Sequence, residues 1–104
     1  MAAILVDHSI AGFEASAGRA ATMLKALANE KRLMILCKLL EHGEMGVTAL
    51  GREVGLSQSA LSQHLARMRE EGLLGTRRDS QSIFYSVIDH DVIRILATLK
   101  TIYC

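Results

Sequence analysis

The sequence predicts a mostly helical domain that carries one small β-hairpin, and three observations support this prediction. Residues that favour helices dominate the 104-residue chain, and proline is absent. Over most of the chain, apolar residues recur with the helical period of about 3.6 residues. Between residues 73 and 88 the period changes to the two-residue alternation of strands. The length suits one domain, expected to span residues 1–104 with a flexible segment at residues 1–8.

Two helices are expected before the first strong turn signal. The first, over residues 9–28, has an alanine-rich surface that permits close approach of another helix. Asn29 suits the N-cap of the second helix, which ends where Gly43 follows His42. Apolar residues of this second helix follow one stripe, so we expect the helix to be deeply buried. The stripe consists of Leu33, Leu36, Cys37 and Leu40.

A helix-turn-helix unit is expected next. Residues 47–54 form its first short helix, and residues 58–71 form the second, which ends at Gly72. Residues 55–57 make a tight turn between them. A helix, a glycine-containing turn and a second helix at this spacing are typical of helix-turn-helix units that bind DNA.

A β-hairpin and a final helix complete the domain. Strands are expected at residues 73–77 and 83–88, joined by a polar tip at residues 78–82. The last helix begins near residues 89–91, where acidic residues suit the positive end of the helix dipole. The predicted order α-α-α-α-β-β-α is that of a winged helix-turn-helix. The last helix is apolar over more than half of its circumference, so it and the first helix are expected to form a homodimer interface.

The outward face of the helix at residues 58–71 suits the edges of DNA bases. Glutamine can bond adenine, arginine can bond guanine, and serine can bond several edges. No acidic residue occurs between Ser57 and Arg69. Arginines in the hairpin can reach phosphates or an adjacent minor groove. The candidate contacts to double-stranded DNA are Gln58, Ser59, Ser62, Gln63, His64, Arg67, Arg77, Arg78 and Gln81.

The net charge and the motifs of the chain limit the alternative functions. The formal net charge is only +1, so any positive surface for DNA must be local. A polar helix face on its own is more often solvated surface, and the turn and the hairpin are what favour DNA binding here. A winged helix that docks another protein is an open alternative. The chain lacks a glycine-rich loop and a carboxylate pair, so we expect neither an enzyme nor a cofactor.

The sequence indicates a cytoplasmic protein that has no membrane segment. Its longest apolar runs have only a few residues, against the roughly 18 that a membrane-spanning helix needs. The apolar start, Met1 to Val6, lacks a basic leader and makes a poor signal peptide. Two cysteines are too few for a secreted disulfide framework.

Three segments resemble the ArsR family of bacterial regulators. Residues 24–36 (LKALANEKRLMIL) resemble the opening signature of the family, residues 55–65 (GLSQSALSQHL) resemble its recognition helix, and residues 72–86 resemble its wing. The resemblance covers nearly the whole chain beyond the first dozen residues. It implies a homodimer that binds palindromic or near-palindromic operators and is released by an inducer.

Many members of this family sense metals, yet the residues here depart from the metal-sensing patterns. Residues 44–48 hold no cysteine, where metal-sensing relatives commonly carry a Cys-x-Cys motif. Asp89, His90 and Asp91 begin the last helix, but no further His or Glu follows at ligand spacing. We therefore expect no metal site, and a metal-responsive repressor remains an alternative interpretation.

The two cysteines resemble those of the thiol-sensing branch of the family, the HlyU- and BigR-type regulators. Cys37 lies on the second helix, and Cys104 follows the last helix. The resemblance implies sensing of reactive oxygen or sulfur species, in which a bridge between Cys37 and Cys104 alters operator affinity, in an activator or in a repressor. Without the resemblance, a cysteine on an apolar stripe is usually an inert core residue.

Overall fold

The computed structural model describes residues 8–103, and it describes side chains from residue 12 onward. The predicted flexible segment lies outside the described residues, except for His8, which begins the first helix. Within residues 8–103, no helix is both long and apolar enough to cross a membrane. The elements in chain order are α2 (His8–Leu27), α3 (Glu30–His42), β1 (Met45–Gly46), α4 (Val47–Val54), α5 (Gln58–Glu70), β2 (Leu74–Asp79), β3 (Ser82–Val87) and α6 (His90–Tyr103).

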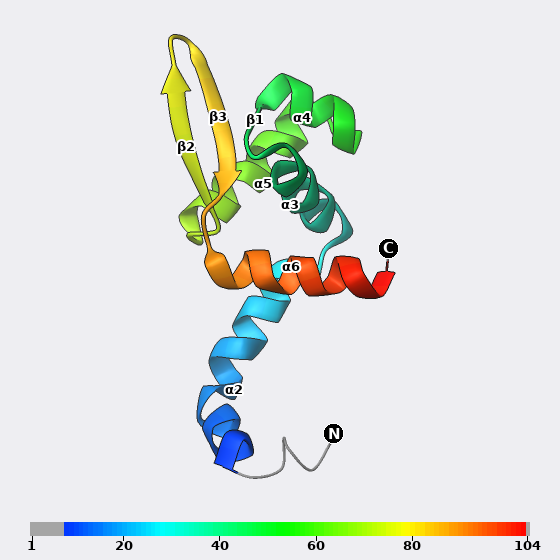
Figure 1. Cartoon of the computed structure of the whole chain (residues 1–104). Coiled ribbons are helices and arrows are strands. Elements are labelled where there is room, and N and C mark those ends of the chain that lie inside the picture. Colours follow the sequence, from blue (N-terminus) through cyan, green and yellow to red (C-terminus); the bar gives the residue numbers. More distant parts are fainter. Residues whose placement is uncertain (1–7, 104) are drawn as a thin grey trace.

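The predicted winged helix-turn-helix is confirmed, with one added strand (Figure 1). β1 pairs antiparallel with β3, so the sheet has three strands in the order β1-β3-β2. The observed order is therefore α-α-β-α-α-β-β-α rather than α-α-α-α-β-β-α. β1 has two residues, too few to show an alternating pattern. Only the pairing of Met45 with Tyr85 and of Gly46 with Phe84 reveals this strand.

The hydrophobic core lies where α3, α4, α5 and the sheet meet. α3 begins as predicted, because the Asn29 side chain accepts a hydrogen bond from the amide of Arg32 at 3.0 Å. Aliphatic side chains from all three helices have no exposed surface, which fixes the helix-turn-helix unit on a rigid base. The fully buried side chains of these helices are Ile35, Leu36, Leu39, Leu50, Leu61, Leu65 and Met68.

The predicted burial of Cys37 is wrong. Cys37 is exposed, although its neighbour Leu36 is fully buried. Successive residues of a helix point about 100° apart, and the buried stripe of α3 runs through Ile35, Leu36 and Leu39. Leu33 and Leu40, which share the predicted stripe with Cys37, are only half-buried. The thiol therefore lies beyond the edge of the core.

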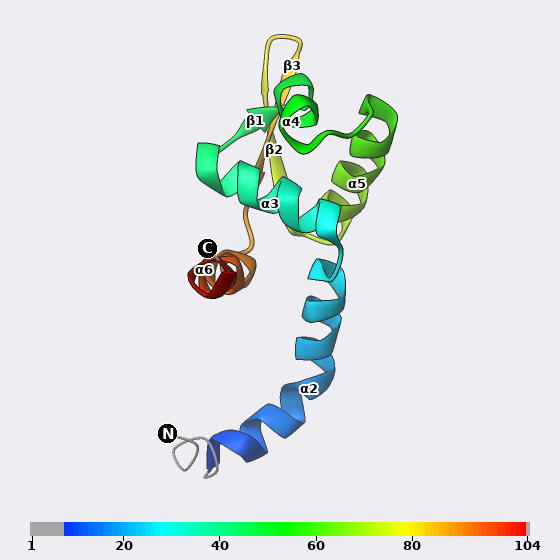
Figure 2. The same cartoon turned by 90° about the vertical axis from the view of Figure 1, so that its right-hand side faces the viewer.

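The first and last helices contribute only a few side chains to this core, namely Leu27 of α2 and Val92 and Leu96 of α6. Figures 1 and 2 show α2 projecting from the body as an arm and α6 lying below α3. The Asp89 carboxylate caps α6 by accepting hydrogen bonds from the amides of Asp91 at 2.9 Å and Val92 at 3.0 Å, which confirms the predicted start. Both helices leave large apolar side chains exposed, namely Phe13, Leu24, Ile102 and Tyr103.

Candidate nucleic-acid interface

The turn between α4 and α5 is held by three local contacts. Gly55 ends α4 in the left-handed region, with φ of 66°, and its amide donates to the Gly51 carbonyl at 3.0 Å. The Ser57 hydroxyl begins α5 by accepting a hydrogen bond from the amide of Ala60 at 3.1 Å. The ammonium of Lys31 donates to the Val54 carbonyl at 3.3 Å. These contacts fix how α5 leaves the body.

One side of α5 is buried and the opposite side is open. The inner side chains Leu61, Leu65 and Met68 are fully buried. Ser59, Ser62, Gln63 and Arg67 follow helical spacing on the open side and are exposed. Gln58 is also exposed, whereas His64 is half-buried at the boundary of the two sides. The structure thus brings the predicted base-reading residues together on one helix, with His64 the least accessible.

The wing presents the remaining candidates beside this helix. β2 and β3 pair from Leu74 with Val87 to Asp79 with Ser82, so the loop consists of residues 80 and 81 only. The predicted tip at residues 78–82 is therefore too long, because Arg78 belongs to β2, where it pairs with Ile83. Arg77, Arg78 and Gln81 are all exposed.

Arg77 is already engaged within the chain. Its guanidinium donates to the Glu44 carboxylate through Nε at 3.2 Å and through Nη2 at 2.5 Å. The same guanidinium lies 4.9 Å from the centre of the Phe84 ring. The hydrogen bonds from Arg77 lower the pKa of Glu44, and Glu44 raises the pKa of Arg77 in return. Arg77 thus ties the wing to the segment that precedes β1.

Arg52 is absent from the sequence-based candidates, although it lies next to Gln58. A hollow of about 250 Å³ at the turn is lined by Arg52 and Gln58 together with Thr48. Arg52 is exposed and belongs to the last turn of α4. A basic residue so close to the helix-turn-helix turn is the signal that identifies it, since such a residue can reach a phosphate.

The two cysteines differ in how far they are described. Cys37 lies in an apolar hollow of about 570 Å³ on α3, beside Leu33, Met34 and Lys38. Cys104 lies outside the described residues, so the distance between the two predicted switch residues does too.

Within residues 8–103, no three of the His, Cys, Asp and Glu side chains form a group that could hold a metal ion.

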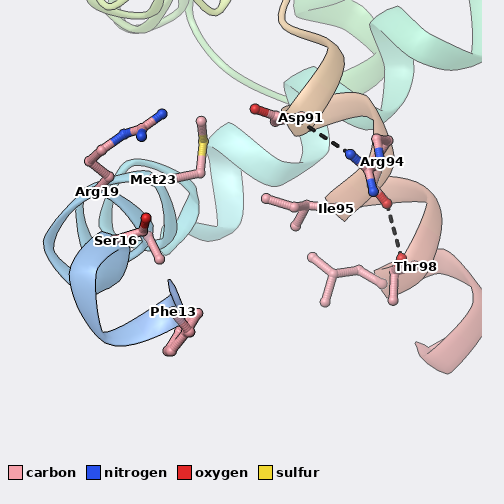
Figure 3. Close-up of a pocket in the computed structure, with 10 residues that line it drawn as sticks. Phe13, Ser16, Arg19, Met23, Asp91, Arg94, Ile95 and Thr98 are labelled. Carbon is pink, nitrogen blue, oxygen red and sulfur yellow. Dashed lines mark hydrogen bonds and ion pairs between the residues drawn. The ribbon is translucent and has the colours of Figure 1, made fainter. Parts of the chain in front are cut away.

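A larger hollow of about 630 Å³ separates α2 from α6. Figure 3 shows Phe13 and Met23 of α2 on one side and Ile95 of α6 on the other. Arg94 of α6 forms an ion pair with Asp91 at 3.7 Å on its rim. Phe13 is the large exposed apolar side chain that lines this hollow.

Comparison with known proteins identifies relatives of this chain. Residues 29–75 match the family model described as bacterial regulatory protein, arsR family. The HTH-type transcriptional regulator YgaV of Escherichia coli strain K12 is 53% identical over 97 residues, which cover 91% of this chain and 96% of YgaV. The transcriptional activator HlyU of Vibrio cholerae is 45% identical over 91 residues, which cover 88% of this chain and 83% of HlyU.

A solved structure agrees with the fold as well as with the sequence. The crystal structure of the transcriptional repressor BigR from Xylella fastidiosa matches with a TM-score of 0.83 and 38% identity. The match covers 89% of this chain and 94% of that chain. The resemblance predicted from residues 24–36, 55–65 and 72–86 is therefore confirmed.

Proposed function

Because the chain belongs to the ArsR family of bacterial regulatory proteins, we propose that it binds operator DNA as a homodimer and that its two thiols control this binding. Its relatives are transcriptional regulators, and the family is one of DNA-binding regulators. In this proposal residues 1–104 form one domain, and the protein acts in the cytoplasm.

The observation that carries the proposed DNA binding is the open side of α5. Four exposed polar side chains line it at helical spacing, and no acidic residue interrupts it. Opposite them, three fully buried side chains anchor the helix, so the polar side faces outward as a rigid unit. Arg78 and Gln81 of the wing and Arg52 of α4 supply further contacts. Base edges are read by α5, and phosphates are held by the flanking arginines.

Homodimerisation is supported by the surfaces that a single chain leaves uncovered. Leu24 of α2 is 58% exposed and Tyr103 of α6 is 80% exposed. Apolar surface of this extent on two neighbouring helices is typical of an interface, and a two-fold axis would place two α5 helices on one duplex. Successive major grooves on one face of DNA lie about 34 Å apart, and the two α5 helices must match that separation.

The exposure of Cys37 supports the thiol switch, because an accessible thiol can be oxidised whereas a core thiol is inert. In the proposed chemistry, a peroxide oxidises one thiol to a sulfenic acid and is itself reduced, releasing one water. The second thiol then attacks the sulfenic sulfur, a disulfide forms, and a second water leaves. The bridge joins α3 to the end of α6. Since α6 contributes to the dimer surface, the two recognition helices change their separation and DNA binding weakens.

The test compares DNA binding by the reduced and the oxidised protein. An operator is first selected from a random duplex library with reduced protein, and affinity is then measured by gel shift. Peroxide or persulfide treatment is expected to weaken binding by about 5- to 150-fold, the usual range of a coupling between two sites. Mass spectrometry of the treated protein is expected to show a Cys37–Cys104 cross-link within one chain.

The thiol-free variant Cys37→Ser/Cys104→Ser is the matched control, since the chain has no other cysteine. It is expected to bind the operator equally well before and after treatment. The five methionines can also be oxidised, and this variant separates their effect from that of the thiols. If it loses DNA as strongly as the wild type on treatment, the thiol switch is wrong. Transcription measured in vitro from a promoter that carries the selected operator decides between activation and repression.

A further inference from the structure

Arg32 occupies a junction that neither the DNA-reading surface nor the thiols account for. It is the one charged side chain that is buried among the described residues, at 8% exposure. Its Nη1 donates to the carbonyl of Ala26 at 2.8 Å and to the carboxylate of Glu71 at 2.9 Å. Burial of a charge is unfavourable unless the charge is paired and hydrogen-bonded, and both conditions are met here.

The three groups come from elements that have different tasks. Ala26 lies in the last turn of α2, Arg32 in the first turn of α3, and Glu71 is the C-cap of α5. The amide of Glu71 also donates to the carbonyl of Arg67 at 3.0 Å, and Arg67 is a candidate DNA contact. One guanidinium therefore connects the end of the α2 arm to the end of the recognition helix.

The α2 arm packs against the core near its C-terminal end, through Leu27 and the partly buried Met23 and Ala26. Leu27 is its only buried side chain among residues 12–27, and Figures 1 and 2 show the arm leaving the body at that end. Only residues 28 and 29 separate α2 from α3. The last carbonyls of a helix have no partner within that helix, and Arg32 supplies one to Ala26. This contact therefore helps to fix the angle of the arm.

We propose that Arg32 is a positioning residue for operator recognition, which sets the angle between α2 and α5 through Ala26 and Glu71. The inference rests on the proposed dimeric DNA binding. In a dimer joined through α2 and α6, a rotation of α5 relative to α2 changes the separation of the two recognition helices. Affinity for a full operator depends on that separation, whereas affinity for a single half-site does not.

The test varies the spacing of the half-sites. Glu71→Ala removes the carboxylate and leaves the exposed side of α5 unchanged, and the neighbouring Glu70→Ala is the matched control. Glu70 is exposed and forms no ion pair within residues 8–103. Binding is measured by fluorescence anisotropy on the selected operator, on versions respaced by one or two base pairs, and on an isolated half-site.

Wild-type protein and Glu70→Ala are expected to prefer one spacing by about tenfold or more, which corresponds to about 1.4 kcal/mol. For Glu71→Ala we expect the preference to fall below about threefold, while half-site affinity changes less than about twofold. Arg32→Lys keeps the buried charge but lacks the planar fork, and the same broadening is expected from it. It serves as the second variant if Glu71→Ala does not fold.

Two results would overturn the role of Arg32 alone. In the first, the folded variants keep the sharp spacing preference of the wild type. In the second, they lose half-site and full-operator binding equally, which means that the contact only supports the fold. Wild-type protein that selects no operator at all is a different result, because it contradicts the proposed DNA binding itself.

Discussion

The two neighbouring arginines of the wing are expected to contribute unequally to DNA binding. Arg77 already donates to both carboxylate oxygens of Glu44 and lies over the Phe84 ring. A contact of Arg77 with a phosphate would replace the Glu44 carboxylate by the phosphate, so few counterions are released when this contact forms. Arg78 is exposed and forms no ion pair within the described part of the chain, so its contact with a phosphate is a net gain. We therefore expect Arg78→Ala to lose DNA affinity and Arg77→Ala to lose little.

The size of this loss follows from the number of phosphate contacts. Each contact to duplex DNA contributes about 0.9 to the slope of log affinity against log salt concentration. A homodimer carries Arg78 twice, so Arg78→Ala is expected to lower the slope by about 1.8. Between about 50 and 200 mM salt this difference amounts to roughly 12-fold in relative affinity. For Arg77→Ala we expect a change in slope below about 0.5.

Anisotropy titrations on the selected operator over a series of salt concentrations give the slope for each variant. Glu44→Gln completes the set, because it releases Arg77 and is expected to increase the slope. Equal losses of slope in Arg77→Ala and Arg78→Ala would refute the reasoning. That result would mean that Arg77 leaves Glu44 for a phosphate when DNA binds.

Three further predictions concern the elements that hold this surface. Gly55→Ala is expected to destabilise the protein by about 1 kcal/mol, because the backbone φ of residue 55 is 66° and a side chain there is strained. Thermal denaturation is expected to give Gly55→Ala a lower melting temperature than Gly51→Ala, because a Cβ at Gly51 meets only ordinary contacts. Equal melting temperatures of the two variants would contradict the strain. Leu65→Ala removes a fully buried side chain of α5 and is expected to cost about 2–5 kcal/mol in a denaturant titration; a loss below about 1 kcal/mol would contradict the packing. Arg77 lowers the pKa of Glu44 below its ordinary 4.5, so the pair stabilises the wing above about pH 4.5, and this contribution disappears as pH falls through the lowered pKa. Melting temperatures measured against pH should therefore fall less steeply at acid pH for Glu44→Gln than for the wild type, and parallel curves would contradict a role of the pair.

Local signals in the sequence predict most of the fold. Asn29, Gly55 and Ser57 mark helix ends through their own backbone and side-chain chemistry, and the structure has helix ends at all three. The change of period after residue 72 locates the wing, because alternation is a property of consecutive residues. β1 escapes prediction because its existence depends on pairing with β3, about 40 residues further along the chain.

The candidate site is predicted less completely, since contacts between distant residues decide it. The open side of α5 follows from helical spacing alone. The engagement of Arg77 does not, because Glu44 lies 33 residues away in sequence. Cys37 is misjudged because a stripe counted from Leu33 is rotated from the buried stripe through Ile35 and Leu39. The pairing of Arg32 with Glu71, 39 residues apart, is likewise invisible in any local pattern.

The central claim is that α5 reads the operator, and the affinity of Gln63→Ala/Arg67→Ala for the selected operator tests it most directly. Both side chains are exposed, so circular dichroism is expected to show an intact fold. Each lost base contact costs about 1–3 kcal/mol, so the reduced double variant is expected to bind at least about 30-fold more weakly than the wild type. Unchanged affinity in a folded double variant would contradict the assignment of α5 as the recognition helix.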